Sequence, residues 1–346
     1  MEKELDFLKE ITDVPGGSGD EGLVRNILKR EINKVTEAKI DGMGNIYGYI
    51  GNGPKVLAPG HMDEIGFKVR GIDKDGKLLI GCAGFVFPYG MECQEYSVVL
   101  DDGTIIDGVI GRDPEQGKHS KLNEIPDFED VRVDIGCNSK EEAEKLGIEI
   151  GNSVIAKSHF MKLQNNQIVA KAWDNRIGCA ISVRVMQDLA DKNLKVTFIG
   201  GGTVQEEVGT RGAKALGIHE APSIAFSLDT APAADEEGSR VGSGPQLFVM
   251  DSGTIAHKKL LRFVKDIARK NNIPYQLCYL RRGGSDACEF QNVSGGIPVL
   301  AIGVAVKNIH TPKSIISYDD YVNTIKLVEA VLLALDEKTI EEIKSF

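Results

Sequence analysis

The spacing of hydrophobic and polar positions changes twice along the chain, near residues 70 and 160. In the first part, helical spacing over residues 21–32 is followed by two apolar runs, 46–50 and 55–59. The turn sequence Gly-Asn-Gly at 51–53 separates these runs, which predicts a pair of neighbouring strands. The first part is therefore expected to supply helices and then strands to a larger domain.

Residues 70–160 have a different pattern, with short alternating runs such as 97–100 and 104–110 separated by glycine turns. Long helical periodicity is nearly absent, and only residues 140–146 have helical spacing. This pattern predicts a small β-rich, barrel-like domain at 70–160, inserted into a larger one.

Helical and strand patterns alternate after residue 160. Strands are expected at 168–172, 195–200, 224–228 and 298–303, and helices at 176–189, 254–270 and 321–335. Such alternation predicts an α/β fold, a three-layer sandwich around a mixed, mostly parallel sheet. Residues 1–69 and 161–346 would form this larger, catalytic domain.

Composition narrows the possible functions. Hydrophobic residues make up 42% of the 346-residue chain, enough for a sizeable core, and the formal net charge is −10. An acidic chain repels phosphate backbones, so nucleic acid is not an expected partner. No apolar stretch reaches membrane-spanning length, and the amino terminus lacks a secretory pattern. The six cysteines are scattered, which is typical of a reducing compartment and predicts a cytoplasmic protein.

Candidate metal ligands lie just beyond the carboxyl ends of five apolar runs. These residues are His61, Asp174, Glu207, Asp229 and His310. Open α/β sheets form their ligand sites at the carboxyl ends of strands, so the five side chains are expected to converge. Singly, all but His61 have more ordinary interpretations, such as a helix cap or a solvated turn. Together, five such positions favour a common site.

The types of these residues suit a pair of divalent ions. Imidazole and carboxylate ligands without cysteine favour Zn, Co or Mn. Two such ions can activate one water and polarise a carbonyl group. The attacking water also needs a proton acceptor that is not itself a ligand. The adjacent pair Glu206 and Glu207 offers this division, because one can bind metal while the other faces the water.

The chain resembles the tetrahedral (TET-type) dinuclear aminopeptidases, which include glutamyl, leucyl and deblocking aminopeptidases and are sometimes labelled endoglucanases. The resemblance covers nearly the whole chain, with its motifs in family order. The motifs are His-Met-Asp-Glu-Ile-Gly at 61–66, Lys-Ala-Trp-Asp-Asn-Arg at 171–176, Thr-Val-Gln-Glu-Glu-Val-Gly at 203–209, Ser-Leu-Asp-Thr at 227–230, Gly-Gly-Ser-Asp-Ala at 283–287 and Ile-His-Thr-Pro at 309–312.

The resemblance implies a role for each residue at the site. Asp174 would bridge two metal ions, His61 and Asp229 would complete one ion's site, and Glu207 and His310 the other's. A water bridging the two ions would attack the amino-terminal peptide bond. Glu206 would be its general base. Asp63, two residues after His61, would point the same way and orient His61 or tune Glu206.

The resemblance also implies partners. The substrates would be peptides with a free amino terminus, and the insertion at 70–160 would mediate dimerisation and assembly into twelve-subunit particles. The chain departs from the family beside the last ligand, where Lys307-Asn308 and Thr311 replace the usual residues. These changes affect the expected substrate preference more than metal binding.

Other functions remain open at this point. A glycoside hydrolase needs two carboxyl groups roughly 5–9.5 Å apart, which Glu206 and Glu207 could provide, but the histidines would then have no role. A catalytically inactive, particle-forming scaffold would leave the intact ligand set unexplained. The acidic segment 235–237 would favour a basic first residue if it reaches the pocket, or would be a solvated loop if it does not.

Overall fold

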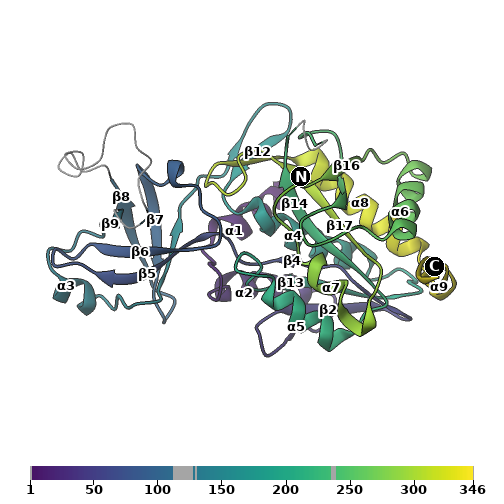
Figure 1. The fold of residues 1–346 in the computed structure, drawn as a ribbon, viewed down its shortest axis with the longest axis horizontal. Helices are drawn as coiled ribbons and strands as arrows, with labels where there is room; N and C mark the ends of the chain where they lie inside the picture. Colours follow the sequence, from purple (N-terminus) through teal and green to yellow (C-terminus); the bar gives the residue numbers. More distant parts are fainter. Residues whose placement is uncertain (1, 112–127, 129–130, 235–238, 346) are drawn as a thin grey trace.

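The computed structural model describes residues 2–111, 128, 131–234 and 239–345, and shows an α/β body with a smaller β-rich part at one end (Figure 1). The β-rich part lies at the left of Figure 1, and both termini lie in the body. Among the described residues, no helix is both long and apolar enough to cross a bilayer.

The body is built on a nine-stranded mixed sheet. Its order is β1 (Lys39–Ile40), β2 (Ile46–Gly51), β13 (Thr197–Thr203), β3 (Lys55–Leu57), β14 (Ile224–Pro232), β17 (Val299–Val306), β15 (Gln246–Met250) and β16 (Gln276–Tyr279), with β4 (Gly60–His61) paired to β13. The central strands β13, β3, β14 and β17 run parallel to one another. Antiparallel pairing joins β1 to β2, β2 to β13 and β15 to β17. The predicted mixed, mostly parallel sheet is confirmed.

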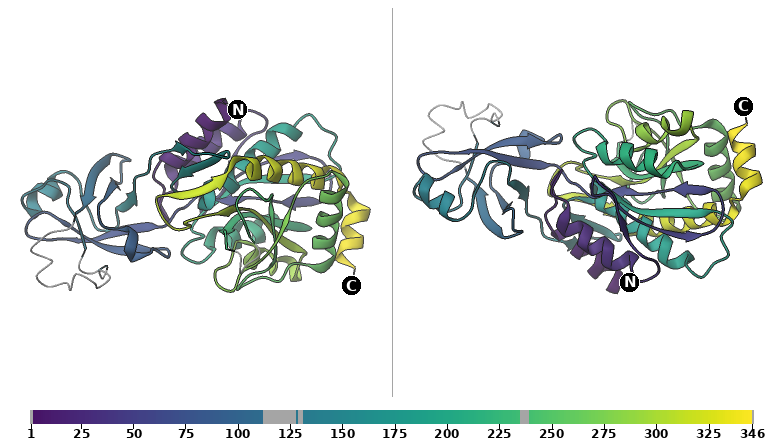
Figure 2. Two further views of the ribbon diagram at one scale, coloured as in Figure 1. Left: turned by 90° about the horizontal axis from the view of Figure 1, so that it is seen from above. Right: turned by 90° about the horizontal axis from the view of Figure 1, so that it is seen from below.

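Helices cover both faces of this sheet (Figure 2). One buried cluster includes side chains of α1 (Glu2–Asp13), α2 (Gly22–Ile32), α4 (Trp173–Leu189), α6 (Lys258–Lys270), α8 (Tyr318–Ala334) and α9 (Glu337–Lys344). A second includes those of α5 (Arg211–Glu220) and α7 (Ala287–Phe290), beside the 3-10 turn Val293–Gly295. Phe198 belongs to the first cluster and the next residue, Ile199, to the second, because successive strand residues face opposite sides. This is the predicted three-layer sandwich.

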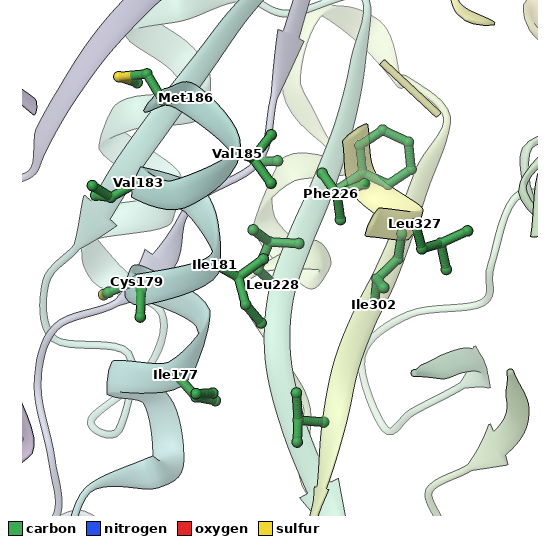
Figure 3. Close-up of a cluster of buried hydrophobic side chains, with 14 of the residues drawn as sticks. Ile177, Cys179, Ile181, Val183, Val185, Met186, Phe226, Leu228, Ile302 and Leu327 are labelled. Carbon is green, nitrogen blue, oxygen red and sulfur yellow. The ribbon is translucent and has the colours of Figure 1, made fainter. Parts of the chain in front are cut away.

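Helix α4 is central to the packing. Its residues Ile181 and Val185 face Phe226 and Leu228 of β14 and Ile302 of β17 (Figure 3). All five of these side chains are at most 1% exposed. Because α4 begins beside the candidate ligand Asp174, its packing on β14 anchors that ligand relative to the sheet.

The smaller part is a six-stranded antiparallel sheet with its own core. Its order is β8 (Ile105–Ile110), β7 (Gln94–Val99), β10 (Ser153–Ala156), β5 (Gly66–Ile72), β6 (Leu78–Ala83) and β9 (Arg132–Val133), accompanied by the helix α3 (Lys140–Lys145) and the 3-10 turn Pro88–Gly90. Val109 and Asp134 exchange two backbone hydrogen bonds of 2.9 Å, which joins the two ends of the sheet. The expectation of a barrel-like insertion is thus confirmed.

Three predictions about elements of the body are wrong. Strands β2 and β3 are not neighbours, because β13 inserts between them; Thr197 donates its backbone N–H to the Pro54 carbonyl in their connection. The strand expected at 168–172 is β12 (Gln167–Ala170), which belongs to a separate three-stranded sheet with β11 (Met161–Lys162) and β18 (Ser314–Ser317). Helix α6 starts four residues after the predicted Thr254, because Ile255 bridges to Met250.

Candidate metal centre

The carboxyl ends of neighbouring parallel strands bring three of the predicted ligands together. His61 ends β4 and pairs with Thr203 of β13, so the chain after β13 delivers Glu206 and Glu207 close to it. Asp229, expected just beyond a strand at 224–228, lies within the longer strand β14, next to Gly303 of β17. The strand ends therefore position most of the site, as the sequence pattern predicts.

Close packing of α4 on β4 depends on Gly60. A Cβ atom at this position would lie 2.4 Å from the Cys179 backbone nitrogen, inside α4. The glycine lets the helix approach the strand that carries His61. The Cys179 thiol in turn donates a hydrogen bond of 3.1 Å to the His61 carbonyl.

Asp174 and His310 reach the site by another route. Asp174 follows β12 of the small sheet, so the prediction that all five ligands follow strands of one sheet is wrong for this residue. It lies in the first turn of α4 with a non-helical backbone (φ −82°, ψ 102°). His310 lies in the turn between β17 and β18 and has a positive φ of 58°. Turns rather than strand ends thus supply these two side chains.

The five predicted ligands form two groups that share Asp174. One group is His61, Asp174 and Asp229, the other is Asp174, Glu207 and His310, and within each the candidate ligand atoms all lie within 4.8 Å of one another. Each histidine Nε2 lies 3.1 Å from a different oxygen of Asp174. Asp174 therefore faces both groups at once.

The two adjacent glutamates occupy different places. Glu207 Oε2 lies 3.7 Å from His310 Nε2, and its Oε1 is buried without a hydrogen-bond partner among the described residues. Glu206 Oε2 lies 3.8 Å from His61 Nε2 and belongs to neither group. Glu207 thus belongs to a candidate ligand group, whereas the Glu206 carboxylate lies beside His61 and belongs to neither group.

Burial of several carboxylates in one place shifts their pKa values. Burial first, and then neighbouring carboxylates, raise the pKa of Glu206, Glu207 and Asp229 well above the usual range. Burial also acts to raise the pKa of Asp174, but hydrogen bonds from His310 and His61 hold it below its usual range. The side chains thus concentrate negative charge that a divalent cation would neutralise, and their oxygen and imidazole donors fit such an ion.

Asp63 contacts the glutamate pair through their backbone. Its Oδ1 accepts a 2.9 Å hydrogen bond from the Glu206 N–H, and its Oδ2 accepts one of 3.2 Å from the Glu207 N–H. Ser18 donates its hydroxyl to the same Oδ2 at 2.6 Å. His61 Nδ1 lies 3.0 Å from the Asp63 carbonyl oxygen and 3.4 Å from its Oδ1. Asp63 therefore links His61 to the loop that carries both glutamates.

Glu64 lies within the motif at 61–66, but the sequence predicts no role for it. Glu64 forms buried ion pairs with Lys171 (2.7 Å) and Arg176 (2.8 Å), residues on either side of Asp174. Arg176 also donates to the Met62 carbonyl at 2.6 Å. These contacts hold the Asp174 segment against the His61 segment. Their spacing of more than 100 residues explains why no local pattern revealed them.

Asp286 is a second residue without a predicted role. It lies in the motif at 283–287, and the residue is only 1% exposed. Thr203, the β13 partner of His61, donates its hydroxyl to Asp286 Oδ2 at 2.5 Å. Asp286 therefore supports the strand beside His61. The acidic segment 235–237, for which a role in substrate choice or a solvated loop was left open, lies outside the described residues.

Comparisons with known proteins place this geometry in a family. The family model described as M42 glutamyl aminopeptidase matches residues 44–327. A glutamyl aminopeptidase of Lactococcus lactis is 32% identical, over 99% of each chain. The solved TET1 peptidase of Pyrococcus horikoshii, described as able to assemble into a tetrahedron or a large octahedral shell, is 32% identical with a TM-score of 0.90, over 96% of this chain and all of the other.

A further solved structure, described as an endoglucanase from Thermotoga maritima, is 29% identical with a TM-score of 0.78, over 98% of this chain and 99% of the other. The family model covers both the strand-end ligands and the histidine loop. The full-length match and the predicted motif order agree with it. The chain belongs to the M42 glutamyl aminopeptidase family and is a peptidase.

Proposed function

We propose that the protein is a metal-dependent aminopeptidase that removes amino-terminal residues from peptides with the help of two divalent ions. The observation that carries this proposal is the pair of ligand groups joined by Asp174, each with one histidine and two carboxylates. His61 and Asp229 would hold one ion, Glu207 and His310 the other, with Asp174 between them. The donor types favour Zn, Co or Mn.

Bound ions of this kind lower the pKa of a water molecule and polarise the carbonyl group of the scissile bond. Glu206 acts as general base, because its carboxylate lies beside both groups without belonging to either. It accepts one proton from the attacking water and then gives it to the leaving amine. The water oxygen joins the carbonyl carbon as the carbon–nitrogen bond breaks.

Asp63 positions this base. Its carboxylate accepts hydrogen bonds from the backbone of both glutamates, so Glu206 and Glu207 keep a fixed orientation relative to His61.

The involvement of both histidines favours this function over glycoside hydrolysis. A glycosidase needs two carboxyl groups and no imidazole, whereas here each histidine faces a separate oxygen of Asp174. An inactive scaffold would not need Glu206 beside a complete ligand set.

The deciding experiment measures metal content and peptide hydrolysis together. The purified protein is treated with a chelator, dialysed and reloaded with Zn, Co or Mn in separate samples. We expect hydrolysis of amino-terminal residues to disappear with the metal and to return on reloading, near two ions per chain. Undiminished activity after complete metal removal would contradict the proposal, as would hydrolysis of glucans by the metal-free protein.

We also propose that the chain forms homo-oligomers, a dimer or a twelve-subunit particle, through the part that contains the six-stranded sheet. Support comes from the assemblies described for the Pyrococcus horikoshii peptidase and from exposed apolar side chains on β8, Ile105 and Val109. Light scattering after size-exclusion chromatography tests this. Replacing Val109 by Glu should shift the mass downward, and a monomeric wild-type protein would rule the proposal out.

A further inference from the structure

A cavity lies beside the second ligand group, where the six-stranded sheet meets the body. Asp174 and His310 form one end of it, and Ile65, Val86 and Phe87 are among its apolar lining residues. The cavity is partly open to solvent. The cavity thus connects the candidate centre with the outside of the molecule.

The walls of this cavity suit an apolar guest. Two charged lining residues, Glu64 and Lys171, are paired with each other at 2.7 Å, so neither offers an unpaired charge to a guest. Phe87 is 40% exposed, and its ring lies 6.4 Å from the His310 ring. An aromatic or large aliphatic side chain would cover exposed apolar surface here, which is favourable by roughly 25 cal/mol per Å².

The burial of the two ligand groups indicates which part of a peptide reaches the cavity. His61 and Asp229, in the first group, are only 2% and 4% exposed. In the second group the Glu207 side chain is 5% exposed and that of His310 is 20% exposed, so His310 marks the open side of the site. A peptide ends at its amino terminus, so the amine fits the closed end, while the rest of the chain must leave past the open end. The residue after the scissile bond therefore lies next to His310.

We infer that this cavity binds the side chain of the residue that follows the scissile bond, and that it selects apolar and aromatic side chains there. This inference rests on the proposed aminopeptidase function and adds a substrate preference to it. Phe87 is the residue expected to contribute most to the selection, because of the two phenylalanine rings beside His310 it is the one that lines the cavity.

Paired peptides test the inference. Leu-Phe-amide and Leu-Gly-amide share their first residue, and the metal-loaded wild type should hydrolyse the first with a kcat/KM at least about 10-fold higher. Phe87→Ala should reduce this preference several-fold. The ratio of kcat/KM for Leu-Gly-amide to that for Ala-Gly-amide reports on the choice of the first residue. In Phe87→Ala this ratio should stay as in the wild type.

Phe85→Ala is the matched control. Phe85 lies two residues away, and the centroid of its ring lies 6.2 Å from that of the His310 ring. It does not line the cavity. This variant should keep the preference for Leu-Phe-amide. A loss as large as that of Phe87→Ala would assign the effect to the aromatic pair in general and overturn the assignment to the cavity.

Binding to the Glu206→Gln variant supplies a readout that does not depend on turnover. Calorimetry should show tighter binding of Leu-Phe-amide than Leu-Gly-amide, and addition of Phe87→Ala should remove the difference. Equal handling of both peptides by an active wild type, or a change only in first-residue preference, would overturn the inference alone. Absence of hydrolysis with every peptide by the metal-loaded protein would instead overturn the proposed function.

Discussion

Two clusters of buried charge lie side by side in this protein, and only one has its carboxylate paired with Lys or Arg; we call this one the balanced cluster and the other the unbalanced cluster. In the first, Glu64 pairs with Lys171 and Arg176 at 2.7 and 2.8 Å. In the second, the ion pairs of Glu206 and Glu207 within the described part of the chain are made with histidines only. The first cluster is complete as a structural element, whereas the second leaves negative charge for a ligand to neutralise.

The two clusters come from the same stretches of sequence. Asp63 contacts the glutamate pair, while its neighbour Glu64 contacts Lys171, because successive residues of an extended chain face opposite sides. Asp174 likewise lies between Lys171 and Arg176 in sequence but faces the histidines. The ion pairs thus hold the backbone from behind while the candidate ligands face forward. A buried carboxylate indicates a binding site only when the chain supplies it no cation.

The largest effect is expected from substituting each of the two neighbouring glutamates in turn. Glu206→Gln should lower kcat by about 10²–10⁴-fold, because the attacking water loses its proton acceptor, while both ions stay bound. Glu207→Gln should instead lose metal, since an amide oxygen replaces a charged ligand. Metal analysis and kinetics on the same preparations separate the two outcomes. Equal metal loss in both variants, or full activity of Glu206→Gln, would refute the division of roles.

A substitution in the balanced cluster should lower the stability of the folded protein. Glu64→Gln keeps the size of the side chain but leaves two buried cations without their counter-charge, which should lower the free energy of unfolding by about 3–5 kcal/mol. Urea unfolding followed by circular dichroism measures this.

The exposed pair between Glu10 and Arg30, at 2.6 Å, provides the control. Because both side chains are solvated, Glu10→Gln should change stability by about 0–1 kcal/mol. If Glu64→Gln unfolds at the same urea concentration as Glu10→Gln, the ion pairs do not hold the site.

Removal of metal from the unbalanced cluster should lower the free energy of unfolding by less than Glu64→Gln does. With free metal at 100 times its Kd, binding adds about 2.7 kcal/mol to the free energy of unfolding, and chelation should remove this. The loss should grow with pH. In the metal-free protein, burial raises the pKa of Glu206, Glu207 and Asp229 above their unfolded values, so the native state holds more protons. Stability from these groups is present at low pH and falls as pH rises through the raised pKa values.

Urea unfolding at about pH 5 and pH 8, with and without metal, measures this pH dependence. Bound ions favour the ionised carboxylates and should remove the decline. If the metal-free protein instead gains stability relative to the metal-bound form from about pH 5 to about pH 8, the expected direction of the pH dependence is wrong.

The sequence predicts the unbalanced cluster better than the balanced one. His61, Asp229 and the glutamate pair follow or lie in apolar strands, and such strand-end positions are recognisable without a structure. Asp174 was predicted as a ligand, but its strand was assigned to the wrong sheet. Pairing of β12 with β18 joins residues nearly 150 positions apart, and no local pattern records it.

Long-range pairing also explains the other errors. A short glycine turn between two apolar runs predicts a hairpin, yet β13 inserts between β2 and β3 because it can bond to both, antiparallel to one and parallel to the other. The pairing of Glu64 cannot be predicted locally, because a single acidic residue in a motif does not show that its partners come from another segment. Local patterns thus identified the strands and the ligand types but not which strands and charges are neighbours.

The smallest effect is expected at Asp63, the residue that connects the two clusters. Asn has one acceptor oxygen where Asp has two, so Asp63→Asn would leave either the Glu206 or the Glu207 N–H without its hydrogen bond. Supporting residues of this kind typically change metal affinity or activity by about 10–100-fold. We expect a loss in kcat within this range and a free energy of unfolding closer to wild type than that of Glu64→Gln. If Asp63→Asn instead unfolds as readily as Glu64→Gln with unchanged kcat, Asp63 belongs to the structural cluster and not to the site.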